Sequence, residues 1–240
     1  MTAAADWVVD EELAADLAAA ALTLARRFAA GATLWSVAPS WEAHAQHIAV
    51  EFVHPVVVGA RALPAVALTG RDLVDAARVS VRAGDVIVAV ADAADREVRS
   101  IMRRAPAWGA TTLWIGNGPR PPTGAADHIL WIDDPDPVVP ATGGFVQLYH
   151  LLWELTHVCF EHPGLLVDDS AECTDEVCLT CRDEARLGEV VEVDDAGTAL
   201  VRTASGPEQV ATALVGSVAP GELVMVHAGT AISRLEEEAG

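Results

Sequence analysis

The sequence contains no lysine, so all fifteen of its basic side chains other than histidine are arginines. Without lysine, the chain cannot form a Schiff base with a carbonyl substrate or supply the lysine of a phosphate-binding P-loop. Its 35 acidic residues leave a formal net charge of −20. Phosphate backbones and anionic membrane surfaces repel so acidic a chain, and we therefore expect no nucleic-acid or membrane partner.

Long uncharged apolar runs are absent as well. Residues 1–6 lack the basic and apolar segments of a signal peptide. The alanine-rich stretch 13–30 is interrupted by Asp16, Arg26 and Arg27, which argue against a membrane span. These features predict a cytoplasmic protein, in which thiols stay reduced.

Cysteine is rare and unevenly distributed. Of the four cysteines, Cys173, Cys178 and Cys181 lie within nine residues. This clustering favours a metal or thiol site over a disulfide framework, because thiolates are good ligands for zinc and iron. Cys159 lies instead in an apolar helical pattern and is predicted to be a buried core thiol.

The cysteine spacing alone leaves three interpretations of the cluster open. The thiols could be free on a linker, or they could be three ligands of a structural zinc ion. Such an ion needs a fourth ligand, for which His162 and His227 are candidates. The third interpretation, an iron-handling thiolate, depends on a resemblance described below.

The first two thirds of the chain alternate short apolar runs with helical patterns. Helices are predicted at residues 11–29, 40–53, 71–79, 94–107 and 144–161, the first with Asp10 as a candidate N-cap. Buried strands are predicted at residues 32–37, 64–68, 85–90, 111–115 and 128–132. This alternation predicts an α/β fold with a parallel sheet covered by helices on both faces.

The pattern changes after Pro163 and Gly164, which end the last helix. Short strands are predicted at residues 189–193, 198–202, 209–214 and 222–226, with a hairpin turn at 194–197, and together they suggest a small β-barrel. We therefore divide the chain into an α/β domain (1–162), an acidic linker (163–176) and a β-barrel domain (177–240).

In the second predicted helix, His44, His47 and Glu51 occupy positions i, i+3 and i+7 and so share one face. Two imidazoles and a carboxylate can ligate a metal or form an acid–base pair. The simpler alternative is an amphipathic helix with solvated polar residues.

Several segments of the α/β domain resemble the phosphoheptose isomerase branch of the sugar isomerase (SIS) family. They are AQHIAVEF at 45–52, RALPAVAL at 61–68, AGDVI at 83–87, WGATT at 108–112 and YHLLWEL at 149–155. The resemblance implies an α/β sandwich that forms homo-oligomers and binds zinc. It also implies that His47, Glu51 and His150 match ligand or catalytic positions, with Glu51 and His150 as the proton-transferring pair if the chain is an isomerase.

The sequence departs from that family where a sugar phosphate would bind. The turn after the first strand reads SVAPS at 36–40, so Pro39 removes a backbone donor and no glycine is present. The second phosphate loop reads ADAADR at 91–96, whose two carboxylates would repel a phosphate. Thr142 replaces the family's glutamine ligand, and Gln147 is at the wrong spacing. We therefore expect the fold to persist without phosphosugar binding.

The C-terminal region resembles the hydrogenase maturation chaperones of the HypC/HupF type. The matching segments are GEVVEV at 188–193, LV at 214–215, GELV at 221–224, VHAG at 226–229 and AI at 231–232. The resemblance implies a small β-barrel with a helical tail. It also implies a role in carrying the iron–cyanide–carbonyl unit to the large-subunit precursor of [NiFe] hydrogenase, together with other maturation proteins.

In that family a cysteine at the start of the domain and a histidine in the closing strand handle the iron, which here implies Cys178 and His227. Cys181 is a rival for the cysteine role, because Cys178 is internal and the family's proline is missing. Cys173 and Cys181 could add a zinc-like set. The leading hypothesis is an accessory chaperone that handles iron transiently or binds zinc. The alternative is a metal-dependent sugar-phosphate isomerase with a regulatory tail.

Overall fold

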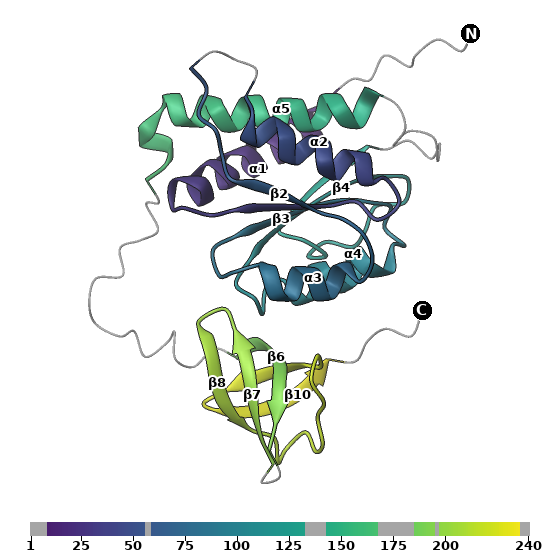
Figure 1. Cartoon of the computed structure of the whole chain (residues 1–240), viewed down its shortest axis with the longest axis vertical. Helices are drawn as coiled ribbons and strands as arrows, with labels where there is room; N and C mark the ends of the chain where they lie inside the picture. Colours follow the sequence, from purple (N-terminus) through teal and green to yellow (C-terminus); the bar gives the residue numbers. More distant parts are fainter. Residues whose placement is uncertain (1–8, 56–58, 133–142, 168–184, 195–196, 236–240) are drawn as a thin grey trace.

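The computed structural model describes residues 9–55, 59–132, 143–167, 185–194 and 197–235, which form an α/β domain and a smaller β-barrel domain (Figure 1). The predicted fold class is confirmed in both parts. None of the described helices is long and apolar enough to cross a bilayer.

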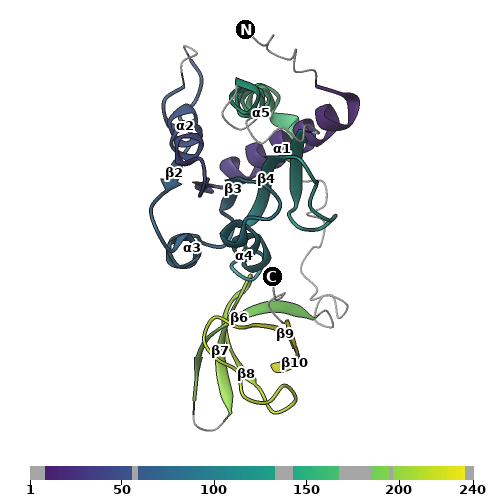
Figure 2. The same ribbon diagram turned by 90° about the vertical axis from the view of Figure 1, so that its right-hand side faces the viewer.

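The α/β domain is built on five parallel strands in the order β2-β1-β3-β4-β5. The strands are β1 (Leu34–Val37), β2 (Ala65–Leu68), β3 (Val86–Val90), β4 (Thr111–Asn117) and β5 (His128–Ile132). Three helices cover one face: α1 (Glu11–Ala29), α2 (Glu42–Val53) and α5 (Gly143–Glu161). Two cover the other, α3 (Leu73–Ser80) and α4 (Arg96–Arg104) (Figure 2).

The central strand β3 explains why this sheet is buried on both faces. All five residues of β3 are buried, and alternate side chains point to opposite faces. Val86, Val88 and Val90 pack in the core under α1, α2 and α5, whereas Ile87 and Ala89 pack in the core next to α3 and α4. An uninterrupted apolar strand is therefore what this position requires.

Capping residues set two helix starts. Asp10 accepts a hydrogen bond from the backbone N–H of Leu13 at 2.8 Å, which confirms the predicted N-cap of α1. Asp95 does the same for Val98 at 3.0 Å, so α4 starts at Arg96, two residues later than predicted.

The second domain is a closed barrel with strand order β10-β8-β7-β6-β9. Its strands are β6 (Arg186–Val193), β7 (Thr198–Thr203), β8 (Gly206–Ala211), β9 (Leu223–His227) and β10 (Thr230–Leu235). The interior is small and rich in valine, and Gly188 is needed there because a Cβ atom at this position would lie 2.3 Å from Val201 Cγ1.

Two details of the barrel prediction were wrong. The strand predicted at 209–214 starts three residues earlier, because Gly206 (φ 115°) allows a tight turn directly after β7. No strand was predicted at Thr230–Leu235, yet β10 pairs with β9 across the Ala228–Gly229 turn. The backbone conformation of that turn, with positive φ at both residues, permits the hairpin.

The predicted domain boundaries are compatible with these elements but stay a prediction. Helix α5 ends at Glu161, a short 3-10 helix follows at Pro163–Leu165, and β6 begins at Arg186. Most of the predicted linker lies outside the described residues, as do Thr142 and the cysteines Cys173, Cys178 and Cys181. Cys159 is buried in α5, as predicted.

The barrel lies against α3 and α4, and a buried carboxylate joins the two domains. Glu189 on β6 is only 1% exposed. Its oxygens accept from Trp108 Nε1 at 2.6 Å and from Arg78 Nε at 3.0 Å, and they form an ion pair with Arg104 Nε at 3.3 Å. Leu223 of β9 belongs to the same apolar core as α3 and α4.

Candidate functional site

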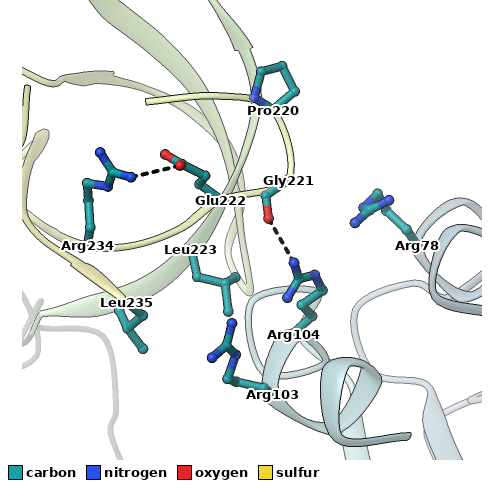
Figure 3. A pocket seen from close by; sticks show the side chains of 9 residues that line it. All are labelled: Arg78, Arg103, Arg104, Pro220, Gly221, Glu222, Leu223, Arg234 and Leu235. Atoms are coloured by element: carbon teal, nitrogen blue, oxygen red, sulfur yellow. Dashed lines mark hydrogen bonds and ion pairs between the residues drawn. The ribbon is translucent and has the colours of Figure 1, made fainter. Parts of the chain in front are cut away.

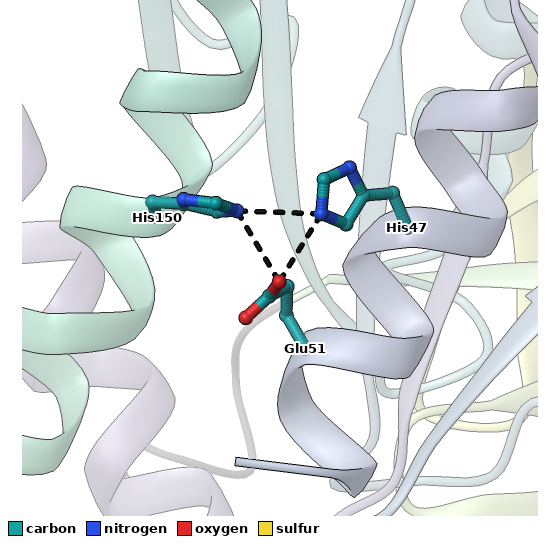
Figure 4. Close-up of side chains that lie close together, drawn as sticks. All are labelled: His47, Glu51 and His150. Atoms are coloured by element: carbon teal, nitrogen blue, oxygen red, sulfur yellow. Dashed lines mark hydrogen bonds and ion pairs between the residues drawn. The ribbon is translucent and has the colours of Figure 1, made fainter. Parts of the chain in front are cut away.

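Helices α2 and α5 pack together and bring three of the predicted residues into one cluster (Figure 4). His47 and Glu51 come from adjacent turns of α2, and His150 faces them from α5. Glu51 Oε1 lies 3.1 Å from His47 Nε2 and 3.3 Å from His150 Nε2. The two imidazole nitrogens are 3.3 Å apart.

These separations match one face of a tetrahedral metal site. Two ligands of a tetrahedral zinc ion lie about 3.3 Å apart, because each is about 2.0 Å from the metal. The side chains are also accessible, since 38% of His47 and 42% of His150 are exposed, whereas Glu51 is 15% exposed. Among the described residues, this is the group of His, Cys, Asp and Glu side chains whose ligand atoms converge within metal-binding distance.

Tyr149 orients this cluster, and the sequence did not suggest it. Its hydroxyl lies 2.9 Å from His47 Nδ1, so His47 can present Nε2 to Glu51 and His150 while Nδ1 is held from behind. Burial, together with the nearby charge of Glu51, raises the pKa of Tyr149 from 10.0 to about 12. The phenol therefore stays neutral at neutral pH, and its oxygen can accept from Nδ1–H when Nε2 of His47 is a metal ligand.

His44 shares the helix face of His47 but has a different role from the one expected. It is 8% exposed, packs against Phe145 and Tyr149, and its Nδ1 lies 3.4 Å from the Tyr149 hydroxyl. It is not among the ligand atoms that converge. The partner of His47 and Glu51 is therefore His150 across the helix pair.

Of the two loops that would hold a sugar phosphate, the second is filled by the chain's own carboxylates, whereas the N-cap of α2 after the first has no side-chain hydrogen bond. After β1, the backbone N–H of Trp41 bonds to Ala38 O at 3.1 Å. After β3, Asp92 accepts from the N–H of Ala94 at 2.8 Å, and the carboxylate of Asp95 caps α4. A phosphate at the start of α4 would have to displace a carboxylate of the same charge.

In the barrel, His227 is the last residue of β9 and is half-buried. Its neighbour Val226 pairs with Arg186, the first residue of β6, so the chain enters the barrel beside His227. Cys178 and Cys181 precede Arg186 by eight and five residues and lie outside the described part of the chain. An extended chain spans about 3.5 Å per residue, so Cys181 and Cys178 can lie at most about 18 Å and about 28 Å from Arg186.

Comparison with known families identifies the C-terminal part. Residues 185–240 match the model of the HupF/HypC family. A search of curated protein sequences finds no match for the chain.

Comparison with solved structures identifies the fold of the N-terminal part. A phosphoheptose isomerase from Francisella tularensis is 16% identical, with a TM-score of 0.51, covering 61% of this chain and 90% of that one. A phosphoheptose isomerase from Neisseria gonorrhoeae is 17% identical, with a TM-score of 0.51, covering 60% of this chain and 86% of that one. At these identities the likeness establishes the fold alone. The chain thus joins an α/β domain with the fold of the phosphoheptose isomerases to a C-terminal domain that matches the HupF/HypC family.

Proposed function

We propose that this chain is an accessory chaperone in [NiFe] hydrogenase maturation, handling or delivering the iron centre to the large-subunit precursor. The observation that carries the proposal is the match of residues 185–240 to the HupF/HypC family. The closed barrel, with His227 at the end of β9 next to the point where the chain enters, supports it.

The chemistry assigned to the barrel is transient binding of iron as cargo by a thiolate and an imidazole. Cys178 is the proposed thiolate, Cys181 its rival, and His227 the proposed imidazole. Soft thiolate and imidazole ligands suit iron. Cys173 is assigned no role in cargo binding.

A deletion strain tests the proposal at the level of the cell. Without this protein, and with no redundant chaperone present, the hydrogenase large subunit should accumulate as an iron-free precursor. Metal analysis of the purified large subunit measures this. Fully metallated hydrogenase in the deletion strain would refute the proposed function.

Single cysteine variants test the site. We expect Cys178→Ala and His227→Ala to abolish the chaperone–precursor complex on a native gel, while Cys173→Ala leaves it intact. Loss of the complex in Cys181→Ala, with Cys178→Ala unaffected, would move the thiolate to Cys181.

A second candidate function, a metal-dependent sugar-phosphate isomerase, is favoured by the cluster of His47, Glu51 and His150. These residues would hold zinc, which would supply a Lewis acid that polarises a carbonyl oxygen. Glu51 and His150 would act as the proton-transferring pair only where they are not themselves zinc ligands, because a nitrogen or oxygen lone pair bound to zinc cannot accept a proton. The carboxylate of Asp95, which caps α4, argues against phosphosugar binding at the second loop.

Zinc titration and a turnover assay separate the two candidates. We expect His150→Ala to remove one equivalent of bound zinc, and Tyr149→Phe to weaken binding of that equivalent by about tenfold through loss of the support for His47. The exposed His54, replaced by Ala, is the matched control and should bind as the parent does. Turnover of sedoheptulose 7-phosphate by the zinc-loaded protein would favour the isomerase.

The predicted partners follow from the same proposal. We expect the large-subunit precursor and other maturation proteins to bind the barrel, and the α/β domain to form homo-oligomers. Light scattering after size-exclusion chromatography of the purified chain measures the oligomeric state.

A further inference from the structure

A cavity of about 640 Å³ lies where the barrel meets α3 and α4 (Figure 3). Its size falls in the range of about 300–1,000 Å³ typical of small-molecule sites. Four of its nine lining residues are the arginines Arg78, Arg103, Arg104 and Arg234, and one, Glu222, is acidic. In a chain of net charge −20, this concentration of positive charge is the reverse of the overall balance.

The arginines reach the cavity from both domains (Figure 3). Arg78 comes from α3, Arg103 and Arg104 come from α4, and Arg234 comes from β10 on the barrel side. The lining residues thus come from two helices of the α/β domain and from the barrel. The cavity therefore exists only because the two domains dock.

Several of these guanidinium groups are held in place by the protein. Arg104 is 9% exposed and donates to the carbonyl of Gly221 at 3.2 Å. Arg234 forms an ion pair with Glu222 at 2.8 Å and donates to the carbonyl of Ser217 at 3.0 Å. Donors fixed in this way need little reordering when a ligand binds, which favours affinity.

In the described part of the chain, three carboxylates pair with Arg78, Arg104 and Arg234. The carboxylate of Glu189 forms ion pairs with both Arg78 and Arg104. Glu222 forms an ion pair with Arg234, and Asp75 forms one with Arg78. Arginine side chains stay charged at all physiological pH values, so they can donate to an anion in the cavity throughout that range.

The rest of the wall is apolar, formed by Pro220, Leu223 and Leu235. A ligand that fits would therefore direct negative groups toward the arginines and a carbon skeleton toward these apolar side chains. Guanidinium groups bind phosphate and carboxylate oxygens in pairs, with two parallel hydrogen bonds. We propose that this interdomain cavity binds a small organic polyanion, a molecule with two or more phosphate or carboxylate groups. The site is separate from the barrel histidine and from the His47 cluster, and the proposal does not depend on the hydrogenase function.

Calorimetric titration of the full chain with inorganic pyrophosphate and with citrate tests the proposal, at constant ionic strength set with sodium chloride. We expect saturable 1:1 binding of at least one probe, and glycerol as a neutral control should give none. The pyrophosphate and citrate arms distinguish a phosphate ligand from a carboxylate ligand. The absence of binding for both probes would overturn the proposal.

Charge-removing variants locate the site. Arg103→Ala combined with Arg234→Ala should weaken binding by about tenfold or more, since one charge-assisted hydrogen bond accounts for roughly that factor. The matched control is Arg120→Ala, because Arg120 also holds two carboxylates, those of Glu12 and Asp16, but lies outside the cavity. An equal loss in the control and the double variant would overturn the proposal.

Protection from chemical modification keeps the test valid if the double variant fails to fold. The parent chain is treated with phenylglyoxal, which modifies accessible arginines, with and without the binding probe. Mass spectrometry of the peptides should show slower modification of Arg103 and Arg234 with the probe present, and an unchanged rate for Arg120. Equal rates with and without the probe would refute the site.

Glu236, Glu237 and Glu238 follow Leu235 directly and carry the charge of the proposed ligand. A chain ending at Leu235 is therefore titrated beside the intact chain. Probe binding to either chain supports the proposed cavity site, provided that the double arginine variant abolishes that binding. The absence of probe binding to both chains would overturn the proposal.

Discussion

Tyr149 is the single tyrosine of the chain, and its hydroxyl touches two histidines of the neighbouring helix. Its position shows how one buried polar group can prepare a site: it holds Nδ1 of His47, and Nε2 then faces Glu51 and His150. The same burial that makes the contact specific also disfavours the charged phenolate.

Alkaline titration reports this residue alone, because no other tyrosine absorbs. We expect the phenolate absorbance to appear with a midpoint of about 12, above the ordinary value of 10.0. Burial is the larger cause and the charge of Glu51 the smaller, so Glu51→Gln should lower the midpoint only partly. Because folding raises this pKa, its contribution to stability is complete below pH 10 and is lost as the pH rises through about 12. A midpoint near 10 in the folded parent would contradict the buried position.

At the scale of elements, the sheet depends on close contacts that only small residues permit. Gly116 in β4 pairs with Trp131 in β5, and the Trp131 indole donates to Gly118 O at 2.7 Å. A Cβ atom at position 116 would lie 2.4 Å from the carbonyl oxygen of Ala91 and 2.4 Å from ring carbons of Trp131. The indole therefore packs directly over the glycine.

Gly116→Ala should destabilise the α/β domain by about 1–3 kcal/mol, because the backbone carbonyl and the indole must both shift. Chemical unfolding followed by circular dichroism measures the change. Gly164→Ala is the matched control, since a Cβ atom there meets nothing within 4 Å. A loss no larger than in the control would mean that the β4–β5 edge adapts easily.

At the scale of the whole molecule, the two domains dock through a small polar centre surrounded by apolar contacts. Glu189 contributes the carboxylate, and Trp108, Arg78 and Arg104 contribute the donors. Arg202 of β7 lies over the Trp108 ring. It also donates to the backbone carbonyls of Arg78 in α3 and of Val81, the residue after α3, each at 2.6 Å. A docking orientation that separated Glu189 from these donors would be unfavourable, because it would leave a buried carboxylate unpaired.

Glu189→Ala should lower the free energy of unfolding by about 3–5 kcal/mol, since it removes the carboxylate paired with the buried guanidinium of Arg104. We also expect faster cleavage between the domains in limited proteolysis. Glu208→Ala removes the partly exposed pair with Arg186 and should cost less than about 1 kcal/mol. Equal costs for the two variants would show that the docking does not depend on Glu189.

Backbone periodicity made much of the fold predictable from the sequence. Residues 11–29 and 128–132 form the predicted helix and strand with the same bounds, and His47 and Glu51 share a helix face because they are four residues apart. Each of these features depends on neighbours in the chain.

Contacts between distant segments could not be read in this way. His150 was suggested only by a family resemblance, and it meets His47 because α2 and α5 pack side by side. Nothing in the local pattern marks Glu189 as the partner of Trp108, 81 residues away, or draws Arg103 and Arg234 to one cavity. The sequence by itself determined most of the elements and the pairing of His47 with Glu51, because local spacing controls both. Only the tertiary structure decided which side chains meet, because docking of helices and domains depends on shape and charge across the whole molecule.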